Sequence, residues 1–285
     1  FFLHSEWRKD KHSNFDWVGT LIFAGWTLSL VVGLTGLPQW PSIAALLLSC
    51  GLLILFIKHQ AGNPEPLIRI QLFRESRLFS FSLASASLMY GATYPLNFVL
   101  SLYLQYIRGL SPLESGQLIM VQAFAMALLA PIAGKLSDRI QPRIISTVGC
   151  SSVAIGFFML CQLGFNTSTT YVSTSLFFIG IGFGLFSAPN HNAVMSSVPS
   201  DEVGVASATI SLARVCGNLV GISLINLLVH LLLGNNQIAP ELYEQLLIMI
   251  RYAMILASIF VVTAVLLSGS RGTIKRPAKI DSHTR

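Results

Sequence analysis

The sequence predicts an all-α membrane protein with about eight transmembrane helices, the last six of which form a C-terminal bundle. Hydrophobic residues make up 53% of the 285 residues and charged residues only 11%, whereas an ordinary soluble domain has about 25% charged residues. The mean hydropathy is +0.67. So much apolar surface cannot be buried in one soluble core of this length, and lipid is therefore the expected solvent.

Eight segments are long and apolar enough to cross a bilayer, since a helix rises 1.5 Å per residue and needs about 20 apolar residues to do so. The second segment is the shortest, and the third and seventh are long enough to tilt or to extend beyond the bilayer. In order, they are Trp17–Leu37, Pro41–Ile57, Phe79–Ile107, Leu113–Ala133, Ile144–Gly164, Thr170–Asn190, Val205–Leu233 and Gln245–Ser268.

The loops between these segments predict the orientation. Of the 18 Lys and Arg residues, 15 fall on one side and only Arg108 falls on the other, while Arg214 and Arg251 lie within segments. Because basic residues favour cytoplasmic loops, both ends of the chain are expected in the cytoplasm. The same pattern explains the net charge of +6 without nucleic acid.

This segment order predicts the organisation of the chain. We expect a cytoplasmic lead-in (1–16), two extra helices (17–57), a basic cytoplasmic linker (58–78), a six-helix bundle (79–268) and a basic cytoplasmic tail (269–285). The linker alternates apolar and basic residues, so it is either an interfacial helix or a simple connection. The first residue is Phe, and we interpret the chain as the C-terminal part of a longer one.

The residues 134–143, "GKLSDRIQPR", place four charges between two uncharged segments. We expect Gly134 to allow a close turn after a helix. Asp138 precedes the next helix, where a carboxylate is favoured by the helix dipole. Arg139 and Arg143 are four residues apart and can share one helical face. The stretch therefore predicts a compact charged loop at the membrane surface.

This loop resembles the cytoplasmic motif G-x-L-[SA]-D-R-x-G-x-[RK] of the major facilitator superfamily, at Gly134, Leu136, Asp138, Arg139 and Arg143. Gln141 stands where the motif has its second Gly. The stretches "LYLQYIRGLSPLESG" (102–116), "GIGFGLFSAP" (180–189) and "GVASATISLARVCGNLVG" (204–221) are similar to the drug:proton antiporter branch with fourteen helices. The resemblance implies the last eight of fourteen helices, an N-terminal six-helix bundle outside this chain, and loops that favour the outward-facing state.

Polar residues within the segments are the candidate transport residues, because they are costly in lipid. Arg214 lies near mid-membrane, where it either faces a cavity or pairs with a carboxylate elsewhere, or else binds backbone carbonyls. Tyr90, Tyr94 and Asn97 lie around Pro95, which predicts a kink, and they either line a cavity or simply pack. Gln122 and Met126 are candidates for the same cavity. We expect close helix packing at Gly180, Gly182, Gly184, Gly217 and Gly221.

Several kinds of chemistry are not supported. Each of the four cysteines lies in an apolar run without a C-x-x-C pair, so no metal site is expected. There is no nucleotide-binding loop, no catalytic triad and no reason to expect a cofactor. The segments carry no Asp or Glu in their interior, so the carboxylates of a proton-coupled carrier are expected outside this chain.

The most consistent prediction is the C-terminal portion of a secondary transporter in the cell membrane. It would alternate access and export amphipathic or drug-like compounds, with protons as coupling ions; the direction and the substrate class follow from the resemblance alone. The alternative is a non-transporting membrane scaffold or sensor made from a truncated bundle. A membrane-embedded enzyme is the weakest alternative.

Overall fold

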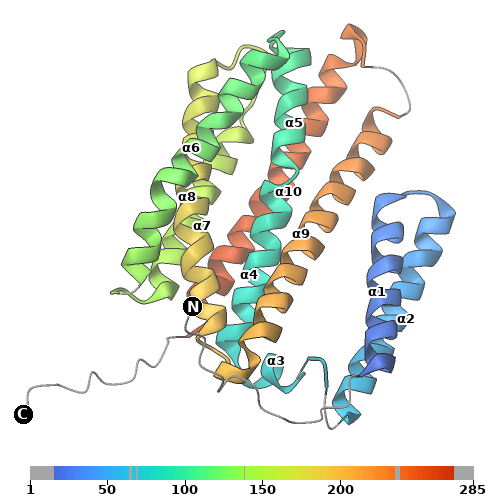
Figure 1. The fold of residues 1–285 in the computed structure, drawn as a ribbon. Helices are drawn as coiled ribbons and strands as arrows, with labels where there is room; N and C mark the ends of the chain where they lie inside the picture. The colour runs from blue at the N-terminus through green and yellow to red at the C-terminus, as the bar shows by residue number, and fades with distance from the viewer. Residues whose placement is uncertain (1–15, 64–65, 69, 138, 235–237, 273–285) are drawn as a thin grey trace, which may run out of the picture.

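The computed structural model describes residues 16–63, 66–68, 70–137, 139–234 and 238–272 (Figure 1). Within these ranges the chain is all helical and has no strand. Residues 1–15 of the expected lead-in and 273–285 of the expected tail lie outside the described residues.

Seven of the described helices are long and apolar enough to span a membrane. They are α1 (Trp17–Thr35), α2 (Trp40–Gly62), α6 (Pro112–Ser137), α7 (Pro142–Leu160), α8 (Thr169–Met195), α9 (Val203–Leu232) and α10 (Tyr243–Ser270), which the turn η4 (Pro240–Leu242) precedes. A short helix α3 (Gln71–Glu75) and a turn η3 (Ser200–Glu202) lie in the loops.

The segment expected at 79–107 is helical but broken, and it is not one of these seven helices. It consists of α4 (Arg77–Thr93), α5 (Leu96–Leu102) and a π-helical turn η2 (Tyr103–Ile107), and α4 and α5 follow one another through the bundle in Figure 1. The break falls at Pro95, as expected, because proline has no N–H to donate to the preceding turn. Tyr94 still donates its N–H to the carbonyl of Tyr90 at 2.9 Å.

The bundle is organised around three helices. α8 packs against both α6 and α7, α10 packs against both α4 and α7, and α4 also packs against α9. The largest buried side chains include Phe157, Phe186 and Met89 in the interior. Large apolar side chains such as Leu113 and Leu266 are 72% and 67% exposed on the outside, as a surface in contact with lipid requires.

Glycines bring the helix backbones into close contact. A Cβ on Gly217 of α9 would collide with the backbone carbonyl of Ser87 on α4, and one on Gly221 would collide with that of Gly91. On α8, a Cβ on Gly180 would meet Gln122 of α6, and one on Gly182 would meet Gly149 of α7. Gly184 approaches the carbonyl of Met126 on α6 in the same way, with 2.9 Å between that oxygen and an added Cβ. Small residues thus set the spacing of three helix pairs, α4–α9, α6–α8 and α7–α8, where lipid supplies no hydrophobic driving force.

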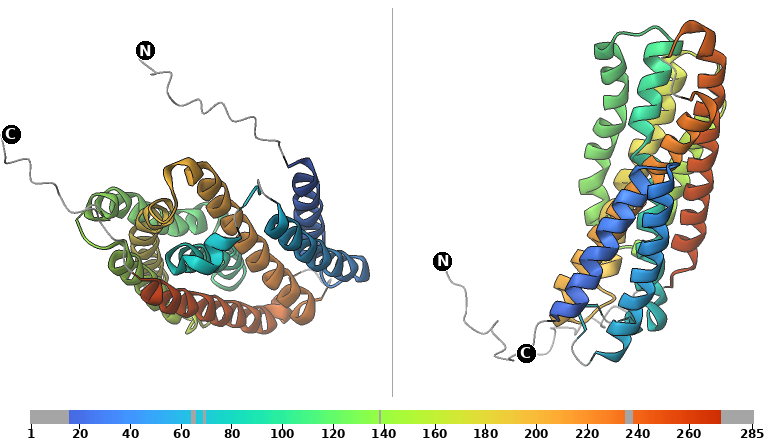
Figure 2. Two further views of the ribbon diagram at one scale, coloured as in Figure 1. Left: turned by 90° about the horizontal axis from the view of Figure 1, so that it is seen from below. Right: turned by 90° about the vertical axis from the view of Figure 1, so that its right-hand side faces the viewer.

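The pair α1 and α2 forms a hairpin beside the bundle, next to α9 (Figure 2). Asp16 caps α1 by accepting from the N–H of Gly19 at 2.8 Å, and it joins the two helices through His59 at 3.0 Å and Gln60 at 2.8 Å. These bonds, that of His59 first, lower the pKa of Asp16 to about 2. The carboxylate therefore supports the hairpin above its ordinary pKa, and this support is lost only as the pH falls toward 2.

We expect Gly217→Ala to lower the midpoint of thermal unfolding in detergent, because overpacking a close contact costs about 1–3 kcal/mol. Gly204→Ala is the matched control on the same helix, since a Cβ there meets no atom within 4 Å. It should leave the midpoint unchanged or raise it slightly, because alanine favours helices. Equal midpoints for the two variants would contradict the close α4–α9 contact.

Candidate functional site

A cavity of about 400 Å³ opens between α4, α8 and α9. It lies toward the end of the bundle that carries α3 and the α6–α7 loop, which we call the basic end (Figure 1). Its wall is mixed: Ala86, Phe186 and Ile210 are apolar, whereas Ser187, Asn190 and Ser211 are polar. A volume of this size, with few polar groups in a mainly apolar wall, is typical of sites for small molecules.

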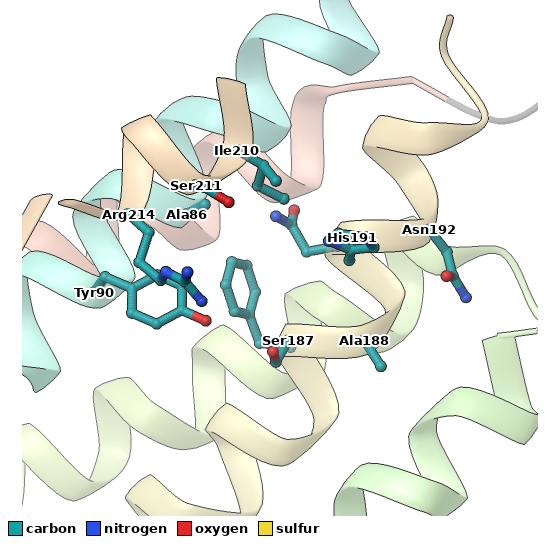
Figure 3. A pocket seen from close by; sticks show the side chains of 11 residues that line it. Ala86, Tyr90, Ser187, Ala188, His191, Asn192, Ile210, Ser211 and Arg214 are labelled. Atoms are coloured by element: carbon teal, nitrogen blue, oxygen red, sulfur yellow. The ribbon is translucent and has the colours of Figure 1, made fainter. Parts of the chain in front are cut away.

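Arg214 is the charged centre of this cavity. Its Cζ lies 5.7 Å from the centroid of the Tyr90 ring, in a cation–π contact, and Figure 3 shows the two side chains together on one side of the cavity. Tyr90 is held in turn by an edge-on contact with Phe183 at 5.0 Å. Among the described residues, no hydrogen bond or salt bridge occupies the Arg214 guanidinium, so its donors face the cavity.

The opposite wall comes from the end of α8, where Asn190, His191 and Asn192 follow Pro189. Asn190 is buried, and His191 is exposed to the cavity. The sequence predicts a segment that ends at Asn190, but α8 continues to Met195. His191 therefore lies within the helix and lines the cavity with Arg214.

A buried arginine lies directly behind this wall. Arg271, at the end of α10, is 1% exposed. It donates to Asn190 Oδ1 at 2.6 Å, to Ser82 Oγ at 3.1 Å and to the carbonyl of Pro142 at 2.8 Å. Asn190 completes the cluster by donating to the carbonyl of Ser82 at 3.1 Å. Four helices, α4, α7, α8 and α10, therefore meet at one side chain.

No carboxylate of the described residues pairs with Arg271. Burial lowers its pKa to about 10, which still leaves it charged at neutral pH. Its Nε has no partner in the described part of the chain. By sequence, Arg271 is one of the 15 bases assigned to the cytoplasmic side, and nothing in the sequence distinguishes it from the other bases of the tail.

The charged loop is attached to the bundle at both ends. Asn192 of α8 donates to Ser137 Oγ at 2.8 Å at the end of α6, and Arg271 binds Pro142 at the start of α7. The expected turn at Gly134 is wrong, because α6 continues through Ser137 and the chain turns after it. Leu136 is still helical, and Asp138 lies outside the described residues.

The remaining predicted residues do not gather at the cavity. Tyr94 is 58% exposed, and Asn97 also faces outward. Gln122 and Met126 lie on α6, where their backbone carbonyls are in close contact with Gly180 and Gly184 of α8. Gln122 has a buried Oε1 without a partner among the described residues. Of the six candidates, the structure brings together only Tyr90 and Arg214.

Arg251, which also lies within a membrane helix, is outside the cavity, and its Nε donates to the carbonyl of Leu163 at 2.8 Å. Among the described residues, no group of three His, Cys, Asp or Glu is placed to hold a metal ion.

Comparisons with known proteins agree on one family. The family model described as Major Facilitator Superfamily matches residues 15–222. The uncharacterized transporter YebQ of Escherichia coli (strain K12) is 30% identical over 205 residues, which cover 70% of this chain and 45% of YebQ. The multidrug resistance protein Stp of Mycobacterium tuberculosis (strain ATCC 25618 / H37Rv) is 25% identical over 221 residues, covering 76% and 41%.

The riboflavin transporter RibZ of Clostridioides difficile (strain 630) is 26% identical over 208 residues, which cover 72% of this chain and 44% of RibZ. The chain thus spans less than half the length of these curated relatives.

We expect Arg271→Met to destabilise the bundle by roughly 3 kcal/mol or more, because each hydrogen bond from a charged group contributes about 1.5–3 kcal/mol and the acceptors would remain buried. Thermal unfolding in detergent measures this effect. Arg108→Met is the matched control, since Arg108 is partly exposed and donates a single bond, to the carbonyl of Phe165 at 2.8 Å. Arg271→Lys should be intermediate, because an ammonium cannot reproduce the planar fork. If Arg271→Met and Arg108→Met were equally stable, the cluster would not hold the bundle together.

Proposed function

This chain belongs to the major facilitator superfamily, and we propose that it forms the C-terminal bundle and central hairpin of a proton-coupled exporter of amphipathic compounds. The remaining part of the carrier would be an N-terminal six-helix bundle, with the basic end of this bundle in the cytoplasm of a cell-membrane protein. The sequence pattern assigns 15 of the 18 basic residues to that side of the membrane, which supports this orientation.

The observation that carries the proposal is the cavity around Arg214. A charged side chain within a membrane helix is costly and is retained where it meets a substrate or a counter-charge. Here the guanidinium lies over the Tyr90 ring and turns its remaining donors to a cavity of about 400 Å³. Apolar and polar lining residues together suit amphipathic molecules, which need both kinds of contact.

The relatives support the same class of function. A transporter, a multidrug resistance protein and a riboflavin transporter are each similar over most of this chain. Riboflavin and many drugs share a planar apolar body with polar groups. A wall that combines aromatic rings with an arginine would bind such molecules through stacking and cation–π contacts.

Proton coupling needs a group that changes its charge during transport. Histidine is the residue type that does so near neutral pH, and His191 lines the cavity with Arg214. We propose that the exchange of protons uses carboxylates of the N-terminal bundle, with His191 as the contribution of this chain. This arrangement would place the Arg214 guanidinium and the exchanged proton at the same cavity.

In the full-length protein, we expect Arg214→Ala to lower transport at least tenfold, because a lost bond to a charged group costs about 1.5–3 kcal/mol. The measurement is uptake into inverted membrane vesicles that carry an imposed proton gradient. Riboflavin and the lipophilic cation tetraphenylphosphonium serve as the two test compounds. Protein abundance in the membrane is measured in parallel, so that loss of transport is separated from loss of protein.

Arg251→Ala is the matched control. It also removes an arginine from a membrane helix, but one whose Nε bonds to the backbone of Leu163 outside the cavity. Transport should survive in this variant. Wild-type transport of both compounds by Arg214→Ala would remove Arg214 from the mechanism, and the absence of any gradient-driven uptake by the wild type would favour the scaffold alternative.

A further inference from the structure

A second, apolar space lies on the other side of α9, between the α1–α2 hairpin and the bundle. It consists of two adjoining cavities of about 550 and 600 Å³. Both are lined by Phe23 of α1, Phe56 of α2, Ile68 of the linker, and Thr209 and Leu212 of α9. We call this space the hairpin groove. Figure 1 shows the hairpin standing next to α9 along this side of the molecule.

Most hydroxyl groups of the groove already donate to the backbone and offer little to a polar ligand. Thr20 donates to the carbonyl of Asp16 at 2.8 Å, Thr27 to that of Phe23 at 2.6 Å and Thr209 to that of Val205 at 2.7 Å. Ser80 likewise donates to the carbonyl of Phe73 at 2.6 Å. Because these donors are bound to the backbone, the side chains present mainly methyl and methylene groups. The groove is therefore suited to a hydrocarbon chain.

Basic side chains stand beside the groove at the basic end. Lys58 follows Ile57, which lines the groove, and Arg74 follows the lining residue Phe73. Arg77 begins α4, one turn before the lining residue Ser80. All three side chains are exposed, and Glu75 is the acidic residue among them. The three bases outnumber the acid, so the apolar groove ends at a net positive rim at the basic end of the bundle.

We propose that the hairpin groove binds an anionic phospholipid of the leaflet at the basic end. An acyl chain would fill the space between Phe23, Phe56 and Leu212, and the phosphate would lie near Lys58, Arg74 and Arg77. Basic pockets between membrane helices attract anionic headgroups, and each Lys or Arg near the surface adds to that attraction. This site is separated from the Arg214 cavity by α9, and it does not depend on transport.

The shape of the space favours a lipid over a helix from the rest of the carrier. A helix with its side chains is about 10–12 Å across, whereas the groove consists of two adjoining cavities of small-molecule size. A helix would also leave the basic rim without a counter-charge. A lipid supplies the apolar chain and the anion in one molecule.

The test uses two photoactivatable phospholipids that carry the same diazirine-bearing acyl chain, one phosphatidylglycerol and one phosphatidylcholine. The full-length protein is reconstituted into phosphatidylcholine vesicles with a small fraction of either probe, illuminated, and digested for mapping of the adducts by mass spectrometry. The adducts are assigned to single residues by fragmentation of the peptides, because Trp26, Leu28 and Leu47 lie in one stretch without a Lys or Arg. We expect the anionic probe to label Trp26 and Cys216, which line the groove, several-fold more than the zwitterionic probe. At Leu28 and Leu47 on the outer hairpin surface, 68% exposed in each case, both probes should label equally.

Charge variants then distinguish the contribution of the lipid headgroup to binding from that of the acyl chain. Arg74→Gln should lower the preference for the anionic probe about fivefold, the factor that corresponds to about 1 kcal/mol per basic residue. Lys135→Gln, which removes an exposed base from the last turn of the distant helix α6, should leave the preference unchanged. Because both side chains are exposed, neither variant depends on refolding of the interior. Ala213→Phe, on the groove wall, should reduce labelling in the groove and leave Leu28 and Leu47 labelled.

Two outcomes would overturn the proposal. Equal labelling of the groove by both probes would mean ordinary contact with bulk lipid. No labelling at Trp26 and Cys216, with normal labelling at Leu28 and Leu47, would mean that protein covers the groove.

Discussion

The bundle depends on one buried cation. Arg271 connects the ends of α4, α7, α8 and α10 with three hydrogen bonds, all to neutral oxygen atoms of Ser82, Asn190 and Pro142. A buried charge without an ion pair is tolerated only where such acceptors replace water. Its position also suits the end of α10, because a cation is favoured at a helix C-terminus. The same side chain fixes the start of the helix after the charged loop, so the loop geometry follows from a contact with the last helix.

The remaining architecture follows from the absence of a hydrophobic driving force between helices in lipid. Close contact has to come from shape, and the glycines of α8 and α9 supply it by admitting neighbouring backbones. One helix is interrupted for a different reason. Pro95 has no N–H to donate, so α4 ends at Thr93 and α5 begins at Leu96. The break lies beside Gly221, whose Cβ position is 3.0 Å from the Pro95 ring. The proline and the glycine therefore belong to the same contact.

The sequence was sufficient for the helical membrane class and for the break at Pro95, because lipid imposes segment length and proline imposes the break. It was not sufficient to predict whether each residue of a helix faces the interior of the bundle or its outer surface. The interior of the bundle and the surrounding lipid are both apolar, so the helices are hydrophobic all round and carry little directional signal. Tyr90 and Tyr94 show the consequence: they are four residues apart, yet Tyr90 meets Arg214 while Tyr94 is 58% exposed. The burial of Arg271 was also not predictable from the sequence, since a charge count places every basic residue after the last span in a solvated tail.

Asn190 connects the Arg271 cluster to the Arg214 cavity. Its side chain accepts a hydrogen bond from Arg271 and donates one to the carbonyl of Ser82 on α4. The residue also lines the cavity opposite Arg214. The cavity wall formed by α4 and α8 is therefore held at its basic end by the same contacts that hold α7 and α10. A wall fixed in this way cannot open by separating α8 from α4 without exposing a buried guanidinium and its acceptors, which is costly. Movement of this bundle as one body costs none of these bonds. The contacts around Arg271 thus favour motion of the bundle as a rigid body over local opening of the cavity between α4 and α8.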